Sequence, residues 1–492
     1  MTDSISKNIL HDGCRSKCGE GGIPADIRSI KPDSLTGMIF AMEGMQHTIV
    51  LLNGPMGCKF YHSTTSQFLT IRPLLYLPST EEGKKVPVDY NYLNDWFFRQ
   101  PRVPCTYLDG YDYVYGTGEK VRQALRFLRD NVDFDMIAIV NSPGASLIGD
   151  NLKEIAGQEI PDCRTVMLES PGYSEDFSSG YGRAVLEMLR QVGLPMWQRA
   201  GHVVNQGAGQ IMQSGAGPAV QSGAGPDTEP GKGPAAEPGK GPAVEPQSEG
   251  QHAAGKADGF RHVNILGLSL WQLYQEGDRE ELERILGMCG IKVNAFLCAG
   301  SSLEELEKLP EADLNIVLYE ENDGGCAAWL RDTCGTPYHI CRKLPVGFDE
   351  TEHFIQDICQ TLGGDFDLAS FREEMERARA LAWYKVNEIY QMCGLPKGVS
   401  FAVCGTADQE DAYTTFLKEY LGMKPVGPGQ AELVFSDANV ISELMTKRSG
   451  FCGIQISLPG MGYVDIIRKT HLGIRGALFL IEQVLNGLMS KL

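Results

Sequence analysis

Two apolar segments each end in an abrupt turn rich in glycine and proline, and this pattern most restricts the fold. The segment 48–52 leads into Asn-Gly-Pro-Met-Gly-Cys at 53–58, and 136–140 leads into Asn-Ser-Pro-Gly-Ala-Ser at 141–146. Short apolar runs of this kind are typical of strands buried on both faces of a parallel sheet. The Cys58 thiol and the Ser142 hydroxyl should therefore lie at the carboxyl ends of two strands, where α/β sheets bind ligands.

The rest of the chain alternates apolar strands with amphipathic helices. Strands are expected at 48–52, 136–140, 263–268, 292–298, 314–318, 399–403 and 432–435. Helices are expected at 119–131, 181–192, 278–288, 302–308, 326–333, 368–393, 410–421 and 475–492. Strand–helix alternation predicts an α/β fold, here three doubly wound, Rossmann-like parallel-sheet domains around a central cleft.

One segment interrupts this alternation. Residues 205–259 consist mainly of Gly, Pro, Ala, Gln and Glu in short repeats, with almost no large apolar residue. Such a segment cannot bury enough surface to offset its ordering entropy, so we predict a disordered Gly/Pro-rich linker. The predicted organisation is a first α/β domain at 1–204, the linker at 205–259, a second α/β domain at 260–365, and a third at 366–492 with a long connecting helix and a C-terminal helix.

Composition excludes some classes of function. The net charge of −19 argues against binding to nucleic acid, which requires a basic face. No apolar run reaches membrane-spanning length, and the first residues lack the apolar core of a signal peptide, so we expect a cytoplasmic protein without a membrane partner. The 14 cysteines are scattered, as for thiols in a reducing compartment with a few possible metal ligands. So many thiols would suit an anaerobic host.

Several short motifs, taken in order, make the chain similar to one family. They are Gly-Pro-Met-Gly-Cys at 54–58, Gly-Thr-Gly-Glu-Lys-Val at 116–121, Ser-Leu-Ile-Gly-Asp at 146–150, Gly-Thr-Pro at 335–337, Pro-Val-Gly at 345–347 and His-Leu-Gly-Ile-Arg-Gly-Ala at 471–477. With them the chain resembles nitrogenase component 1 and its relatives: the molybdenum–iron protein subunits, the related cofactor-assembly scaffold, and the catalytic subunits of dark-operative protochlorophyllide reductase. The resemblance covers essentially everything except the linker.

The resemblance implies an iron–sulfur cluster, [4Fe–4S] or related, at a subunit interface, held by three cysteines of the first domain. The corresponding residues here are Asp33, reached by a gapless count of 25 positions back from Cys58, then Cys58 itself and Ser142. Oxygen ligands can bind iron, although cysteine is the usual cluster ligand. A carboxylate ligand in protochlorophyllide reductase supports Asp33. Cys14 and Cys18, a pair beside two cationic residues, either supply the missing thiolates or lie idle at a frayed terminus.

The same resemblance argues against a large catalytic cofactor. Cofactor-bearing members hold it with a cysteine and a histidine, whose positions fall near Tyr319 and Gly462 in this chain. Neither residue matches, so we expect no molybdenum–iron cofactor and no nitrogen reduction. The remaining cysteines, Cys105 among them, show no Cys-x2-Cys pairing and are interpreted as core or surface thiols.

Three functions remain open from the sequence. The favoured one is an oxidoreductase subunit that takes low-potential electrons from an ATP-dependent iron protein, through the cluster, to an unknown substrate. ATP would be handled by that partner, because this chain has no phosphate loop. The alternatives are a cluster- or cofactor-assembly scaffold and a non-catalytic partner subunit. The resemblance implies a dimer or heterotetramer, formed with a sister component 1 subunit or with a second copy.

Overall fold

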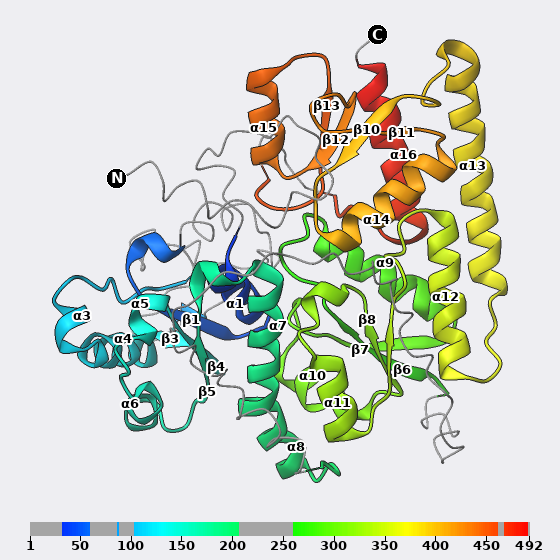
Figure 1. Ribbon diagram of the computed structural model, residues 1–492. Coiled ribbons are helices and arrows are strands. Elements are labelled where there is room, and N and C mark those ends of the chain that lie inside the picture. Colours follow the sequence, from blue (N-terminus) through cyan, green and yellow to red (C-terminus); the bar gives the residue numbers. More distant parts are fainter. Residues whose placement is uncertain (1–31, 60–85, 88–102, 206–258, 461–466, 491–492) are drawn as a thin grey trace, which may run out of the picture.

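The computed structural model describes residues 32–59, 86–87, 103–205, 259–460 and 467–490 (Figure 1). Cys14, Cys18, Gly462 and nearly all of the predicted linker lie outside these residues. Three parallel sheets of three or four strands, each with helices packed against it, occupy three regions of the molecule. The predicted α/β fold with three doubly wound, Rossmann-like units is therefore confirmed, while the domain boundaries at 204/205, 259/260 and 365/366 stay predictions.

The first sheet consists of β1 (Thr48–Asn53), β4 (Met136–Asn141) and β5 (Arg164–Glu169), in the order β1-β4-β5. All pairs are parallel, and Leu52 is in register with Val140 and Asn53 with Asn141. The helices of this part of the chain are α1 (Ser34–Glu43), α3 (Asp112–Tyr115), α4 (Gly118–Asn131), α5 (Pro143–Ser146), α6 (Leu152–Glu159), α7 (Phe177–Met188) and α8 (Leu194–Ala200). Two short strands, β2 (Val86–Pro87) and β3 (Val132–Asp133), form a separate parallel pair.

Alternation along the strands explains why both faces of this sheet are covered. Val50 and Leu52 point into a core with α1 and α7, whereas Ile49 and Leu51 point into a separate core with α4 and α6. Successive side chains of a strand face opposite sides, so a strand that is apolar throughout requires helices on both sides. Helix α4 presents its three buried apolar residues to the sheet as its periodicity predicted: Val121, Leu125 and Leu128.

The other two sheets have the same design. The strand order of the second sheet is β7 (Ile291–Phe296), β6 (Arg261–Leu266), β8 (Leu314–Val317) and β9 (Tyr338–Ile340). The third runs β11 (Lys424–Pro425), β10 (Ser400–Val403), β12 (Leu433–Ser436), β13 (Cys452–Gln455). Their helices are α9 (Gln275–Met288), α10 (Leu303–Glu307), α11 (Cys326–Cys334), α12 (Phe348–Leu362), α13 (Ala369–Cys393), α14 (Ala407–Thr415), α15 (Ala438–Lys447) and α16 (Gly473–Met489). None of the helices in the described ranges is both long and apolar enough to cross a membrane.

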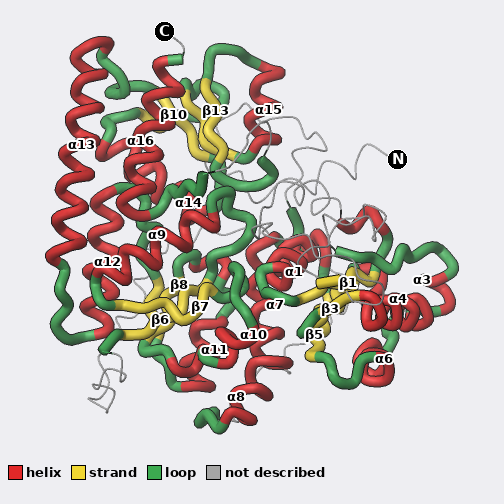
Figure 2. Tube along the Cα trace, turned by 180° about the vertical axis from the view of Figure 1, so that it is seen from behind, coloured by secondary structure: helices red, strands yellow, loops and turns green. Residues whose placement is uncertain are grey.

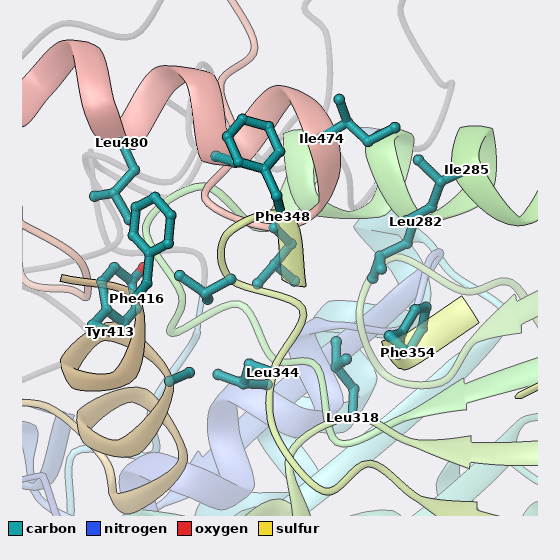
Figure 3. Packing of buried hydrophobic residues seen from close by; sticks show 14 of the residues in the cluster. Leu282, Ile285, Leu318, Leu344, Phe348, Phe354, Tyr413, Phe416, Ile474 and Leu480 are labelled. Carbon is teal, nitrogen blue, oxygen red and sulfur yellow. The ribbon is translucent and has the colours of Figure 1, made fainter. Parts of the chain in front are cut away.

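The second and third sheets share one apolar core. Phe348 of α12, Leu282 of α9 and Leu480 of α16 lie in the same buried cluster (Figure 3). The chain's last helix, α16, packs back against α9, α12 and α13. The 25-residue helix α13 runs along the outer side of both units in the two opposite views (Figures 1 and 2). These two units are therefore held together over their length.

A buried polar contact also joins these units. Asp278 of α9 accepts hydrogen bonds through Oδ1 from Thr470 Oγ1 at 2.6 Å and from the His471 backbone N at 3.2 Å. Burial raises the pKa of Asp278 to about 7 despite these hydrogen bonds, and the negative charge of Glu281 acts in the same direction. The folded protein therefore keeps a proton on this carboxyl group that the unfolded chain releases at much lower pH.

We expect the free energy of unfolding of the wild type to fall as the pH rises from about 4 to about 7, relative to Asp278→Asn. Over this range only the folded state holds the Asp278 proton, which gives a slope of up to about 1.4 kcal/mol per pH unit. Below this range the carboxyl is protonated in both states, so the contribution is complete there. Urea unfolding of both proteins at pH 5 and pH 8 measures the effect, and parallel changes in the two proteins would contradict it.

Candidate functional site at the carboxyl edge of the first sheet

A short extended segment adds a further chain to the first sheet, next to β1. The Leu52 N–H donates to Pro104 O at 2.9 Å, and the Thr106 N–H donates to Leu52 O at 3.0 Å. Leu52 and Cys105 form a parallel bridge. Three adjacent chains, 103–106, β1 and β4, thus run in the same direction and end at the same edge of the sheet.

Cys58 lies where the first turn leaves this edge. After β1 the chain turns at Gly54 and Pro55 and enters one turn of 3-10 helix, Met56–Lys59. The Cys58 N–H donates to Pro55 O at 3.1 Å, which closes this turn. Cys58 is half-buried. The sequence placed this thiol at the carboxyl end of a strand, and its position in the structure agrees.

Ser142 begins the equivalent turn after β4. It is buried, with 1% of its surface exposed, and its hydroxyl caps α5 by accepting the Ala145 N–H at 3.4 Å. A Cβ atom on Gly54 would lie 2.8 Å from the Ser142 Oγ, so the two turns touch through this glycine. Glycine is required at position 54 because any side chain would force the turns apart.

Asp33 reaches the site from another element, the start of α1. Its Oδ1 accepts the Thr36 N–H at 3.0 Å and the Thr36 hydroxyl at 2.8 Å, which is an N-cap arrangement. Its backbone pairs with Asp176, directly before α7. Both side-chain bonds use Oδ1, so they leave the second carboxylate oxygen to other contacts.

Three of the five sequence-predicted residues, Asp33, Cys58 and Ser142, lie near this edge, and two residues that the sequence reasoning missed, Cys105 and Tyr113, lie with them. Burial raises the pKa of the Cys58 thiol, and so do the negative charges of Asp33 and, next, Cys105. Burial also raises the pKa of Tyr113. The nearby Cys58 and Cys105 thiols raise this pKa further, whereas Ser142 lowers it. Among the described residues, no cationic side chain offsets the effects on Cys58.

A buried amide network holds this edge in shape. Asn53 donates through Nδ2 to Thr117 Oγ1 at 3.0 Å and to Asn141 Oδ1 at 2.9 Å, and it accepts the Thr106 hydroxyl at 2.9 Å. The Thr117 hydroxyl in turn donates to Asp150 at 2.8 Å. These contacts join the 103–106 segment, β1, β4 and the two family-like motifs at 116–121 and 146–150. Satisfied buried networks of this kind fix one geometry.

The candidate donors at this edge are a thiol, a carboxylate and a hydroxyl. No three histidine, cysteine or carboxylate side chains within the described ranges lie close enough together to hold one metal ion. A cluster takes one protein ligand at each of several iron atoms, so its ligands stand farther apart than those of a single ion. Thiol and carboxylate groups are suitable donors for such a cluster. The part played by Cys14 and Cys18 stays a prediction.

The rim of this site is apolar and exposed. Met56 next to Cys58 is 63% exposed, Leu147 in the turn after Ser142 is 89% exposed, and Tyr115 at the end of α3 is 71% exposed. Tyr111 and Val114 on the same short segment are also exposed. Contiguous apolar patches on a protein surface mark sites that bind another molecule, and these exposed side chains are candidates for such a patch.

Three parallel-sheet units in one chain, with thiol, carboxylate and hydroxyl groups at one sheet edge, define an α/β protein with a candidate ligand site at that edge. A family model described as nitrogenase component 1 type oxidoreductase matches residues 34–431. The chain belongs to this family. The predicted resemblance is thereby confirmed.

The chain is also similar to individual proteins. It is 32% identical over 169 residues to a light-independent protochlorophyllide reductase subunit of Prochlorococcus marinus (strain MIT 9312), covering 34% of this chain and 30% of the relative. It is 25% identical over 335 residues to the subunit of the same name from Synechococcus sp. (strain CC9902), covering 67% and 51%. The matches thus span about a third to a half of these relatives. A solved structure of nitrogenase Cp1 at pH 6.5 shares the fold, with a TM-score of 0.63 at 15% identity over 94% of this chain and 93% of that one.

Proposed function

We propose that this chain is an electron-accepting subunit of a nitrogenase-like oxidoreductase. It would bind an iron–sulfur cluster, [4Fe–4S] or related, at the carboxyl edge of its first sheet, with Cys58, Asp33 and Ser142 as ligands. The observation that carries this proposal is the convergence of these three residues, from β1, α1 and β4, on one rigid edge. When bound, the cluster would supply one-electron redox chemistry at low potential.

The residues around the site would prepare it for that cluster. The Asn53 network holds the two turns in place, and Gly54 lets them approach each other. The neutral Cys58 thiol would lose its proton when iron binds, because a coordinating metal deprotonates a thiol outright. Tyr113, close to Ser142, would cover one side of the site and limit the access of water.

A second protein chain would cover the sides of the site that Tyr113 leaves open. The exposed rim formed by Met56, Tyr115, Leu147 and their neighbours surrounds the Cys58 turn, so a subunit seated there would bury the site. Family membership supports a sister component 1 subunit or a second copy as this partner, and an ATP-dependent iron protein as the electron donor. The substrate would be reduced without a molybdenum–iron cofactor. In support, the resemblance implies that the cysteine position of that cofactor falls at or near Tyr319, which is 2% exposed and follows β8.

The test is anaerobic purification followed by iron and sulfide analysis and low-temperature EPR of the reduced protein. We expect the wild type to carry iron and acid-labile sulfide, and Cys58→Ala to lose most of both, because oxygen ligands alone hold a cluster poorly. Circular dichroism confirms that the variant is folded. A wild type that binds no metal after anaerobic reconstitution overturns the proposal, and cargo that transfers to other proteins favours the scaffold alternative.

A further inference from the structure

We propose that Cys105 is a second thiolate ligand of this cluster, beside Cys58. The inference rests on the proposed function and deepens it. Asp33 and Ser142 stand at two positions where the family resemblance implies thiols, so Cys58 alone would leave an iron–sulfur cluster with a single thiolate from this chain's described residues. Cys105 would supply a second one from a neighbouring chain of the same sheet.

The position of Cys105 in the sheet supports this role. Segment 103–106 lies beside β1 and runs parallel to it, so Cys105, the Cys58 turn and Ser142 come from three adjacent chains at one edge. Sheet order alone thus places the second thiol on the side of Cys58 opposite Ser142. Asp33 approaches from α1, so four donors reach the site from four separate segments.

The local contacts of the sulfur point in the same direction. The Cys105 Sγ donates to Gly54 O at 2.9 Å, which ties it to the turn that carries Cys58. The Tyr107 backbone N–H donates to this sulfur at 3.3 Å. A backbone N–H aimed at sulfur stabilises a thiolate, and hydrogen bonds to sulfur are one of the means by which proteins tune a cluster. Cys105 is only 7% exposed, so a thiolate here would need a cation to offset its burial.

On ligation the Cys105 thiol would release its proton, now donated to Gly54 O, and its sulfur would bind iron, with no change in oxidation state.

The test compares Cys105→Ser, Cys105→Ala and Cys163→Ser in the full chain, purified anaerobically beside the wild type. Serine keeps a donor for Gly54 O but removes the sulfur, so it separates a structural hydrogen bond from ligation. Cys163 is the matched control because it is a partly buried cysteine of the same unit, placed directly before β5 at the opposite edge of the sheet. Iron and sulfide content, EPR line shape and reduction potential are measured, with thermal unfolding to confirm the fold.

We expect both Cys105 variants to lose iron or to show altered EPR signals and a shifted potential, while Cys163→Ser matches the wild type. Wild-type iron content and EPR in Cys105→Ser would overturn the assignment. If Cys105→Ala unfolds, the serine variant still decides. Loss of iron in Cys58→Ala together with a normal cluster in both Cys105 variants would leave the proposed function standing and reject only this inference. A wild type without a cluster would reject both.

Discussion

Replacing Gly180 by valine is expected to destabilise the protein by about 3 kcal/mol or more, a large effect for a single substitution. A Cβ atom at Gly180 would lie 2.0 Å from Ser34 O and 2.5 Å from Ser34 Cα. At the same crossing, a Cβ atom on Gly37 would lie 2.0 Å from Phe177 O. Helices α1 and α7 therefore meet backbone to backbone, and neither clash can be relieved by rotating a side chain.

This crossing also positions the candidate site. Ser34 follows Asp33 directly, so a side chain that pushes α1 away from α7 would move the Asp33 carboxylate. We therefore expect the milder Gly180→Ala, where it folds, to bind less iron than the wild type. Urea unfolding and iron analysis measure the two effects.

Gly157→Ala provides the control for this substitution. Gly157 lies in α6 of the same unit, and a Cβ atom there would meet nothing within 4 Å. Alanine in an exposed helix should stabilise by about 1 kcal/mol relative to glycine. If Gly180→Val were as stable as this control, the close crossing of α1 and α7 would be refuted.

Much of the fold could be predicted because its strands are buried on both faces. Continuous apolar runs marked β1, β4, β6 and β8, and amphipathic periodicity marked α4 and α13. The strands that were missed are β2, β3, β5, β9, β11 and β13. Of these, β5, β9, β11 and β13 lie at the edges of their sheets, and β2 and β3 form a two-stranded pair. An edge strand is covered less fully, and the burial of β5 alternates along its length, so its sequence lacks a continuous apolar signal.

The candidate site could be predicted only in part, for a different reason. Cys58 and Ser142 follow strands directly, so local sequence places them. Cys105 is on a segment that joins the sheet by only a few backbone contacts, and Tyr113 lies on a four-residue helix. Neither position carries a local signal of its role, and only the packing of 103–106 beside β1 brings them to Cys58.

Replacing Arg284 by methionine is expected to lower the free energy of unfolding by about 3 kcal/mol, because it leaves a buried carboxylate without its main partner. This is the second large effect. Glu281 of α9 is 1% exposed. Arg284 donates to both of its oxygens, at 2.8 and 2.7 Å, and also to Glu374 of α13 at 2.8 Å. The Arg475 N–H, at the start of α16, donates to Glu281 at 3.0 Å. Methionine keeps the apolar stem of Arg284 and removes only its charge and hydrogen bonds.

The double variant Arg284→Met with Glu281→Gln tests whether the Glu281 charge, left with only the more distant Arg475 guanidinium at 3.7 Å, is the cause. Because glutamine removes that charge, we expect the double variant to recover part of the stability, so the two changes should not be additive. Arg342→Met serves as the matched control. Arg342 also binds a carboxylate, Asp357, through two donors, yet its side chain is 75% exposed, so its loss should cost about 1 kcal/mol or less. Equal losses of the free energy of unfolding in Arg284→Met and Arg342→Met would show that the burial of Glu281 does not increase the effect of removing its partner. A larger loss in Arg284→Met would mean that the buried Glu281 carboxylate of α9, which also accepts the Arg475 N–H at the start of α16, needs the Arg284 charge beside it.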